Sequence, residues 1–118
     1  MTTSVAPKGQ SLIYAADISW QTVDAGVQRK VLGHDDAVMM VLVKFEKDAV
    51  GQLHHHPHRQ VSYVASGSFE VTIDGESKTL GAGDCYFVAP DLVHGVKALS
   101  DGVLVDVFTP CRQDFLPS

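Results

Sequence analysis

Histidine is concentrated in one short segment of the chain. Four of the six histidines lie in residues 51–60, whose sequence is GQLHHHPHRQ. His54 and His56 are two residues apart, and on a β-strand this spacing points both imidazoles to the same face. His55 then faces the other way, and Pro57 interrupts the alternation. Imidazole is a common ligand of Zn, Cu, Fe and Ni, so the segment indicates a metal site. A solvated histidine-rich loop is the alternative.

Two further residues can complete such a site. Gln60 follows His56 by four residues, and His94 lies far along the chain, shortly after Pro90. A carboxamide oxygen is a neutral, hard ligand that can join imidazoles around a divalent ion. Because all four ligands are neutral, the ion keeps its full charge, acts as a strong Lewis acid and attracts an anion. His58 is expected to lie outside the ligand set or in solvent.

The C-terminal part of the chain carries a second candidate group. On a strand over residues 103–108, Leu104, Asp106 and Phe108 share one face. Burying a carboxylate costs free energy unless the group is paired, so an Asp106 on this face indicates either a function or a pairing partner. It can face a cavity as a general acid or base, with Arg112 gripping a substrate carboxylate and Phe108 stacking on a sugar ring. The alternatives are a solvated Asp106 at a sheet edge, a structural pair with Arg112, and Phe108 as a core residue.

The sequence that surrounds these candidate groups has the pattern of short strands separated by turn residues, and these strands must position the groups. Ser66-Gly67 and Asp74-Gly75 are typical of tight turns, because glycine tolerates positive φ. No window of helical length shows a 3.6-residue period, although residues 113–116 or the first twenty can hold a short turn. The spacing predicts an all-β sandwich or barrel. The expected strands are residues 27–32, 37–45, 61–65, 69–73, 85–88, 94–99 and 103–108.

Composition narrows the class of protein and its partners. The chain has 118 residues, of which 45% are hydrophobic and 19% charged, and this predicts one folded domain over residues 1–118 with about the first ten flexible. The net charge is −5 without a Lys/Arg cluster, so nucleic acid and anionic membranes are poor partners. The longest apolar run, residues 37–43, is too short to span a membrane, and no secretory signal is visible. Cysteine occurs only twice, which favours the reducing cytoplasm.

Two stretches of the chain resemble the two sequence motifs of the cupin family. The first motif is His-x-His, three or four residues, Glu, six residues and Gly; the matching positions are His54, His56, Gln60 and Gly67. The second motif is Gly, a strand, a proline-rich turn and His, and residues 83–94 match it. The resemblance implies a double-stranded β-helix, or jelly-roll barrel, with one divalent metal ion inside. The implied ligands are His54, His56, Gln60 and His94.

A narrower resemblance covers nearly the whole chain, and it is to the small single-domain cupins of pectin and alginate breakdown, the KdgF type. It rests on Trp20, Gly26-Val27, His56-Pro57-His58, Gln60, Tyr63-Val64, Gly83-Asp84, His94-Gly95-Val96 and the tail Asp106-Val107-Phe108-Thr109-Pro110-x-Arg112. It implies opening of 4,5-unsaturated monouronates to the linear keto acid, with Gln in place of the usual Glu ligand. It also implies a substrate pocket formed by Asp106, Phe108 and Arg112. The chain departs from the family pattern at His55, Arg59, Ala89, Asp91 and Cys111.

Three functions remain open on this basis. They are metal-dependent opening or tautomerisation of a small anionic sugar acid, an iron-dependent cupin dioxygenase, and a non-enzymatic metabolite-binding cupin. Asp106 and Arg112 favour the first, because they supply a proton-transfer group and a clamp for an anion. The metal is expected to be Ni, Zn, Fe or Mn. Many small cupins pair strands across a two-fold axis, so the resemblance implies a homodimer, for which the apolar residues 12–18 are the candidate segment.

Overall fold

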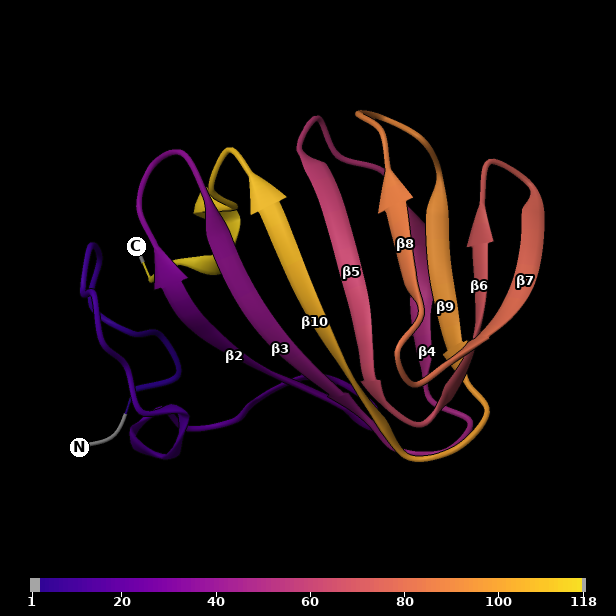
Figure 1. The fold of residues 1–118 in the computed structure, drawn as a ribbon, viewed down its shortest axis with the longest axis horizontal. Helices are drawn as coiled ribbons and strands as arrows, with labels where there is room; N and C mark the ends of the chain where they lie inside the picture. Colours follow the sequence, from indigo (N-terminus) through magenta and orange to yellow (C-terminus); the bar gives the residue numbers. More distant parts are fainter. Residues whose placement is uncertain (1–2, 118) are drawn as a thin grey trace.

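Two antiparallel β-sheets face each other as a jelly-roll barrel in the computed structural model, which describes residues 3–117 (Figure 1). The six-stranded sheet has the order β1 (Gln21–Asp24), β2 (Val27–His34), β3 (Met39–Phe45), β10 (Gly102–Thr109), β5 (Arg59–Ser66) and β8 (Cys85–Val88). The four-stranded sheet has the order β4 (Val50–His54), β9 (His94–Ala98), β6 (Ser68–Ile73) and β7 (Glu76–Gly81). Helical structure over residues 3–117 is confined to two 3-10 turns, η1 (Ala15–Asp17) and η2 (Gln113–Phe115). The expected all-β, single-domain jelly roll is confirmed.

The strands confirm most of the sequence pattern and add to it. Each of the seven expected strands is present, with ends at most two residues from the expected range, and η2 falls within the expected turn at residues 113–116. The three additional strands are β1, β4 and β7, which all lie at a sheet edge and are mostly exposed. An exposed edge strand does not need alternating apolar and polar residues, so the hydrophobic pattern does not reveal these three.

Glycines close the two turns that the sequence marked. Asp74 and Gly75 both have positive φ, 50° and 83°, and form a two-residue hairpin loop between β6 and β7. Gly67 links β5 to β6, which belong to different sheets, at φ 81°. A Cβ atom at Gly67 would lie 2.5 Å from the carbonyl oxygen of Asp101. This position therefore requires glycine both for its backbone conformation and for the close approach of another chain segment.

The neighbouring strands β5 and β10 carry both apolar and polar residues into the barrel. Exposure alternates along both strands, which confirms the expected face of residues 103–108. Toward one end of the barrel the inward side chains are apolar and surround the edge-to-face ring pair of Phe45 and Phe69, whose centroids are 5.3 Å apart. Toward the other end Gln60, Ser62 and Asp106 are polar, while Phe108 belongs to a second buried apolar cluster that includes Val31, Met39 and Val41. The inward residues are Gln60, Ser62 and Val64 on β5, and Leu104, Asp106 and Phe108 on β10.

The N-terminal segment lies against β2. Val5 forms a parallel bridge to Val31, and the Ala6 amide donates a hydrogen bond of 2.9 Å to the Val31 carbonyl. Ala6 is only 1% exposed, so this part of the end that was expected to be flexible is packed in the structure. None of the described helices has the length and apolar character needed to cross a membrane.

The two positive-φ glycines give a matched test of the turn between the sheets. Gly75→Ala meets no atom within 4 Å, so it costs only the strain of a left-handed alanine, about 1–2 kcal/mol. Gly67→Ala carries the same strain and adds a clash with the Asp101 carbonyl, so we expect a further loss of about 1–3 kcal/mol in the free energy of unfolding. Urea denaturation of both variants measures the difference, and equal losses would show that the close approach does not constrain the fold.

Candidate metal centre

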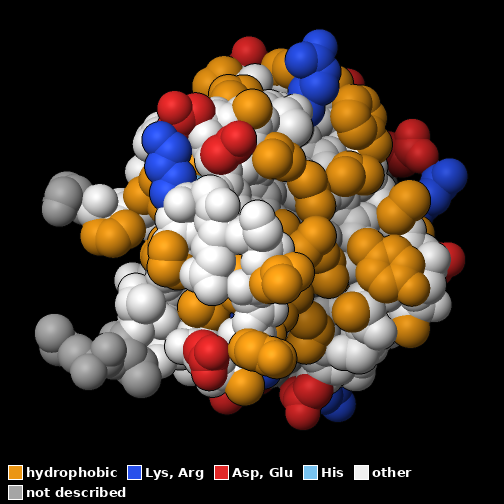
Figure 2. Space-filling model, turned by 60° about the vertical axis from the view of Figure 1, so that its left-hand side comes forward, with side chains coloured by type: hydrophobic (Ala, Val, Ile, Leu, Met, Phe, Trp, Pro, Cys, Tyr) orange, Lys and Arg blue, Asp and Glu red, His pale blue; other side chains and the backbone are white. Residues whose placement is uncertain are grey.

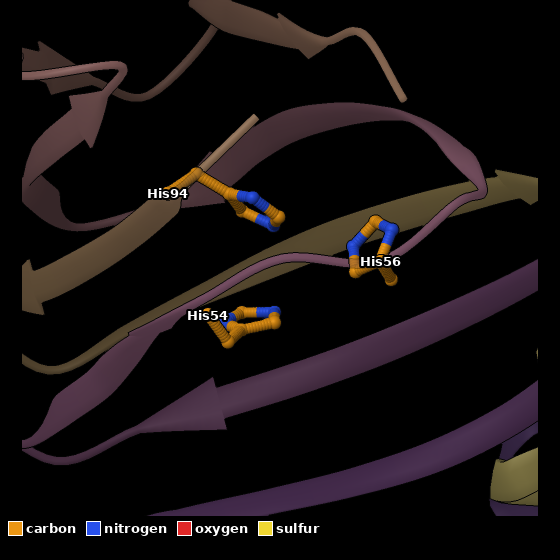
Figure 3. A group of neighbouring side chains, drawn as sticks. All are labelled: His54, His56 and His94. Carbon is orange, nitrogen blue, oxygen red and sulfur yellow. The ribbon is translucent and has the colours of Figure 1, made fainter. Parts of the chain in front are cut away.

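Three histidine rings come together at the polar end of the barrel from separate segments (Figure 3). His54 ends β4 and is paired in register with His94, which begins β9, while His56 lies in the connection between β4 and β5. One ring nitrogen of each histidine lies within 4.8 Å of the other two, and ring centroids are 4.3 Å apart for His54 and His94. This cluster can hold a metal ion.

The route by which His56 reaches the cluster differs from the expectation. Both His54 and His56 were expected on one strand, but β4 ends at His54. Pro57 has no N–H to donate to a sheet, so the strand cannot continue through it. His56 is buried whereas His54 is exposed, so the cluster reaches the surface through His54. His55 is exposed and lies outside the cluster, as expected.

Each histidine is held by a hydrogen bond on the far side of its ring. The Nδ1 atoms lie close to backbone carbonyl oxygens: His54 to Gln52 at 2.7 Å, His56 to His58 at 3.1 Å and His94 to Leu92 at 2.9 Å. A carbonyl oxygen only accepts, so each Nδ1 carries the hydrogen. In a neutral imidazole the other nitrogen, Nε2, then presents a lone pair. This is the arrangement that metal-binding histidines use.

The Gln60 side chain adds a fourth acceptor to the same point. Its Oε1 lies 3.0 Å from His56 Nε2 and 3.1 Å from His94 Nε2, and its Nε2 donates to the Ser62 hydroxyl at 2.9 Å. With Nδ1 protonated, these contacts bring lone pairs together with no hydrogen between them. A second proton on either imidazole, at Nε2, would relieve the repulsion between these lone pairs. Burial disfavours that proton, because it lowers the pKa of His56 and lowers the pKa of His94 to about 4. The donor set therefore fits a bound cation.

Asp106 lies on the strand beside this group, with its side chain buried. Its register partner on β5 is Ser62, whose hydroxyl donates a hydrogen bond of 2.6 Å to Asp106 Oδ1. Burial raises the pKa of Asp106 to about 6, while the Ser62 hydrogen bond and the charge of Arg112 act in the opposite direction. A carboxyl group with this pKa can take up or release a proton near neutral pH.

Arg112 does not pair with Asp106, so the structural ion pair that the sequence allowed as an alternative does not form. Its Nε and Nη2 donate instead to the two carboxylate oxygens of Asp114, at 3.0 and 2.8 Å. The guanidinium carbon lies 5.1 Å from the centroid of the Phe108 ring. Phe108 is 2% exposed and its ring meets that of His56 edge-on at 5.7 Å, so it packs in the core beside the cluster.

A cavity of about 150 Å³ connects these groups. It touches six of the seven predicted site residues: His54, Gln60, His94, Asp106, Phe108 and Arg112. The seventh, His56, contacts Gln60 and Phe108 beside it. The structure thus gathers all seven residues at one end of the barrel.

Three polar residues of this region were missed by the sequence analysis. Ser62 shares the parity of Gln60 on β5, and Tyr86 faces inward on β8, so the alternation of these strands could have found both. Arg29 lines the cavity and stacks on Phe115 at 3.8 Å, and its buried Nε has no hydrogen-bond partner among residues 3–117. It lies in the polar run Gln28-Arg29-Lys30, where the sequence gives no signal that distinguishes it.

Comparisons with known proteins agree with this geometry. A family model described as a cupin domain matches residues 41–108, which include most of β3, both histidine segments and most of β10. The chain is 46% identical over 99 residues to the pectin degradation protein KdgF of Dickeya dadantii (strain 3937), covering 82% of this chain and 90% of that protein.

Two solved structures share the fold at similar identity. An RmlC-like cupin from Shewanella frigidimarina NCIMB 400 superposes with a TM-score of 0.90 at 38% identity, covering 92% of this chain and 98% of the other. KdgF from a Halomonas species superposes with a TM-score of 0.88 at 39% identity, covering 91% of this chain and 99% of the other. The sequence matches and the barrel with its histidine cluster lead to the same assignment: the chain belongs to the cupin family and is similar to the KdgF proteins within it.

Proposed function

We propose that the protein is a metal-dependent enzyme that opens 4,5-unsaturated monouronates, or a similar small carboxylated sugar, to the linear keto acid. The observation that carries the proposal is the meeting, in one cavity, of a cation-binding donor set and the buried carboxyl group of Asp106. Similarity to the pectin degradation protein KdgF supports the substrate class, since pectin is a polymer of uronic acids.

The proposed ligands are the three clustered histidines and Gln60, around one divalent ion that is Ni, Zn, Fe or Mn. When bound, such an ion polarises substrate oxygens as a Lewis acid. Because the side chains of His54, His56, His94 and Gln60 are all neutral, they leave its full charge available to an anionic substrate. The Nδ1 hydrogen bonds to backbone carbonyls fix the ring orientations before anything binds.

The proposed reaction is an isomerisation, so it needs no oxidant or reductant. The bond between the anomeric carbon and the ring oxygen breaks, the anomeric hydroxyl loses a proton and becomes an aldehyde, and the ring oxygen becomes an enol. The enol then becomes a ketone by moving a proton from oxygen to carbon. Asp106 is suited to these transfers, because Ser62 holds Oδ1 while no hydrogen bond from the described residues reaches Oδ2.

The positive side chains of the cavity suit the substrate carboxylate. Asp114 already occupies the Nε and Nη2 edge of Arg112, so Arg112 must offer its remaining hydrogens to a ligand. Arg29 and Arg112 both lie over the ring of Phe115, with distances from the guanidinium carbon to the ring centroid of 3.8 Å for Arg29 and 4.3 Å for Arg112. We assign Arg112 to the substrate carboxylate, with Phe108 forming an apolar wall of the pocket.

We place the reaction in the cytoplasm. Cys85 and Cys111 are both free, and Cys85 is exposed. A reducing compartment keeps such an exposed thiol from oxidation.

The direct test is turnover of a 4,5-unsaturated galacturonate, followed by loss of the ultraviolet absorbance of its enol. Protein purified without a histidine tag and loaded with each candidate metal should open the sugar faster than buffer alone, without oxygen uptake. His56→Ala should abolish this and lose the metal, whereas His55→Ala, next to the cluster but outside it, should keep both. Absence of turnover with every metal would contradict the proposal, and oxygen uptake matched to substrate loss would indicate a dioxygenase instead.

Asp106 gives a test of the proton-transfer role. Asp106→Asn keeps the shape of the side chain but cannot exchange a proton, so kcat should fall about 10²–10⁴-fold with little change in KM. If Asp106 acts as the base, the wild-type rate also rises with pH as this carboxyl ionises, near or below pH 6, because its pKa is about 6 and a bound cation lowers it further. The variant should lose that pH limb. A folded, metal-loaded Asp106→Asn with wild-type turnover would remove Asp106 from the catalytic residues.

We further propose that the protein is a homodimer formed through the outer face of the six-stranded sheet. This face carries exposed apolar side chains on three of its strands, β3, β5 and β8: Met40 (40%), Val61 (44%), Tyr63 (50%) and Phe87 (58%). Figure 2, in which the left-hand side of Figure 1 comes forward, shows hydrophobic side chains gathered on the face that it presents. Such an apolar group of side chains fits a second copy of itself across a two-fold axis.

Light scattering on size-separated protein tests the dimer and its interface. The wild type should be dimeric, and Tyr63→Lys should be monomeric, because it places a charge in the centre of the apolar face. Tyr14→Lys is the matched control in residues 12–18, the apolar segment in which the sequence predicts the interface, and Tyr14 is 81% exposed. Dissociation by Tyr14→Lys alone would assign the interface to that segment, and a monomeric wild type would remove the dimer.

A further inference from the structure

Two buried side chains, Gln60 and Ser62, link the histidine cluster to Asp106 through a chain of hydrogen bonds. Gln60 Oε1 faces His56 and His94, Gln60 Nε2 donates to Ser62 Oγ at 2.9 Å, and Ser62 Oγ donates to Asp106 Oδ1 at 2.6 Å. Ser62 is 1% exposed, so no solvent molecule at the protein surface can replace either of its bonds. β5 and β10 set this alignment, because Ser62 is the register partner of Asp106 and lies two residues from Gln60 on the same face.

The direction of these bonds follows from how many hydrogens are available. A serine hydroxyl has one hydrogen, and here it goes to the Asp106 carboxylate. The Ser62 oxygen can then only accept, so it requires a neighbouring donor, and the Gln60 amide and the Tyr86 hydroxyl both lie within reach of it. Gln60 meets that requirement with its amide N–H, which turns the carbonyl oxygen toward the histidines. Rotating the amide by half a turn would place Oε1 against the Ser62 oxygen and N–H groups toward the cation site.

We propose that Ser62 is the positioning residue of the metal centre, and that it holds Gln60 with its carbonyl oxygen facing the ion. This inference rests on the proposed ligand set but not on the proposed reaction. Ser62 touches neither the ion nor the substrate, and it acts through Gln60. The same pair of bonds also selects an amide over a carboxylate at position 60, because a carboxylate has no hydrogen to give Ser62. The neutral ligand set is thus built into β5 and β10.

Binding of Co²⁺ alone tests the inference, since its visible spectrum reports the ligand geometry. Ser62→Ala frees the Gln60 amide to rotate, so the affinity for Co²⁺ should fall about 10–100-fold, the usual loss when a residue behind a metal ligand is removed. The spectrum of the bound ion should change as well. Ser66→Ala is the matched control, with the same substitution at an exposed position on β5, and should leave affinity and spectrum unchanged. Thermal unfolding of the metal-free variants measures any loss of folding separately.

A double-mutant cycle with Gln60→Ala separates positioning from a general structural effect. Gln60→Ala alone should weaken Co²⁺, and adding Ser62→Ala should then have no further effect, because Ser62 acts only through Gln60. The same loss in both backgrounds would overturn the inference. So would wild-type affinity and spectrum in Ser62→Ala.

Two further outcomes identify which part of the account is wrong. Unchanged Co²⁺ binding in Gln60→Ala would show that Gln60 is not a ligand, which overturns the proposed ligand set and the role of Ser62 with it. Ser62→Thr keeps the hydroxyl and should keep the wild-type affinity and spectrum. If folded Ser62→Thr loses as much affinity as Ser62→Ala, the hydroxyl is not the group that matters and the inference is overturned.

Discussion

Four hydrogen-bond acceptors directed at one point inside a protein are a demanding arrangement. Lone pairs repel one another, and a buried acceptor without a partner costs free energy. In this barrel the hydrogens that could relieve the repulsion are all committed elsewhere, on the Nδ1 side of the three histidines and on the Ser62 side of Gln60. A cation satisfies all four acceptors together, and the rest of the site is arranged around that requirement.

The fold meets this requirement by combining two kinds of interior along the same strands. β5 and β10 present Val64 and Leu104 to an apolar core at one end, and Gln60 and Asp106 to the polar site at the other. The apolar end holds the two sheets at a fixed separation. Strand register then brings residues distant in sequence to within hydrogen-bond distance, as it does for Ser62 and Asp106. Precision at the site therefore comes mainly from strand pairing rather than from loops, with His56 and Arg112 as the exceptions.

The sequence predicts the fold and the site residues better than it predicts their contacts. Period-two alternation was sufficient for seven of the ten strands, because it follows directly from strand geometry, and glycine marked the two turns. The gathering of the seven site residues was implied by the resemblance to the cupins and to the KdgF type. Spacing and parity alone were not sufficient for every contact. They placed His56 on a strand that ends at His54, since the direction of the chain before a proline depends on tertiary packing. They also left open whether Arg112 pairs with Asp106, because its actual partner, Asp114, lies in a 3-10 turn whose geometry no periodicity encodes.

Anomalous X-ray diffraction from crystals of the metal-loaded protein tests the central claim most directly. Data collected at the absorption edge of the bound metal locate the ion without reference to the protein atoms. The account predicts one anomalous peak per chain, among the Nε2 atoms of His54, His56 and His94 and the Oε1 atom of Gln60. A fully loaded crystal with its peak elsewhere, or with Gln60 turned so that its amide nitrogen faces the ion, would contradict it.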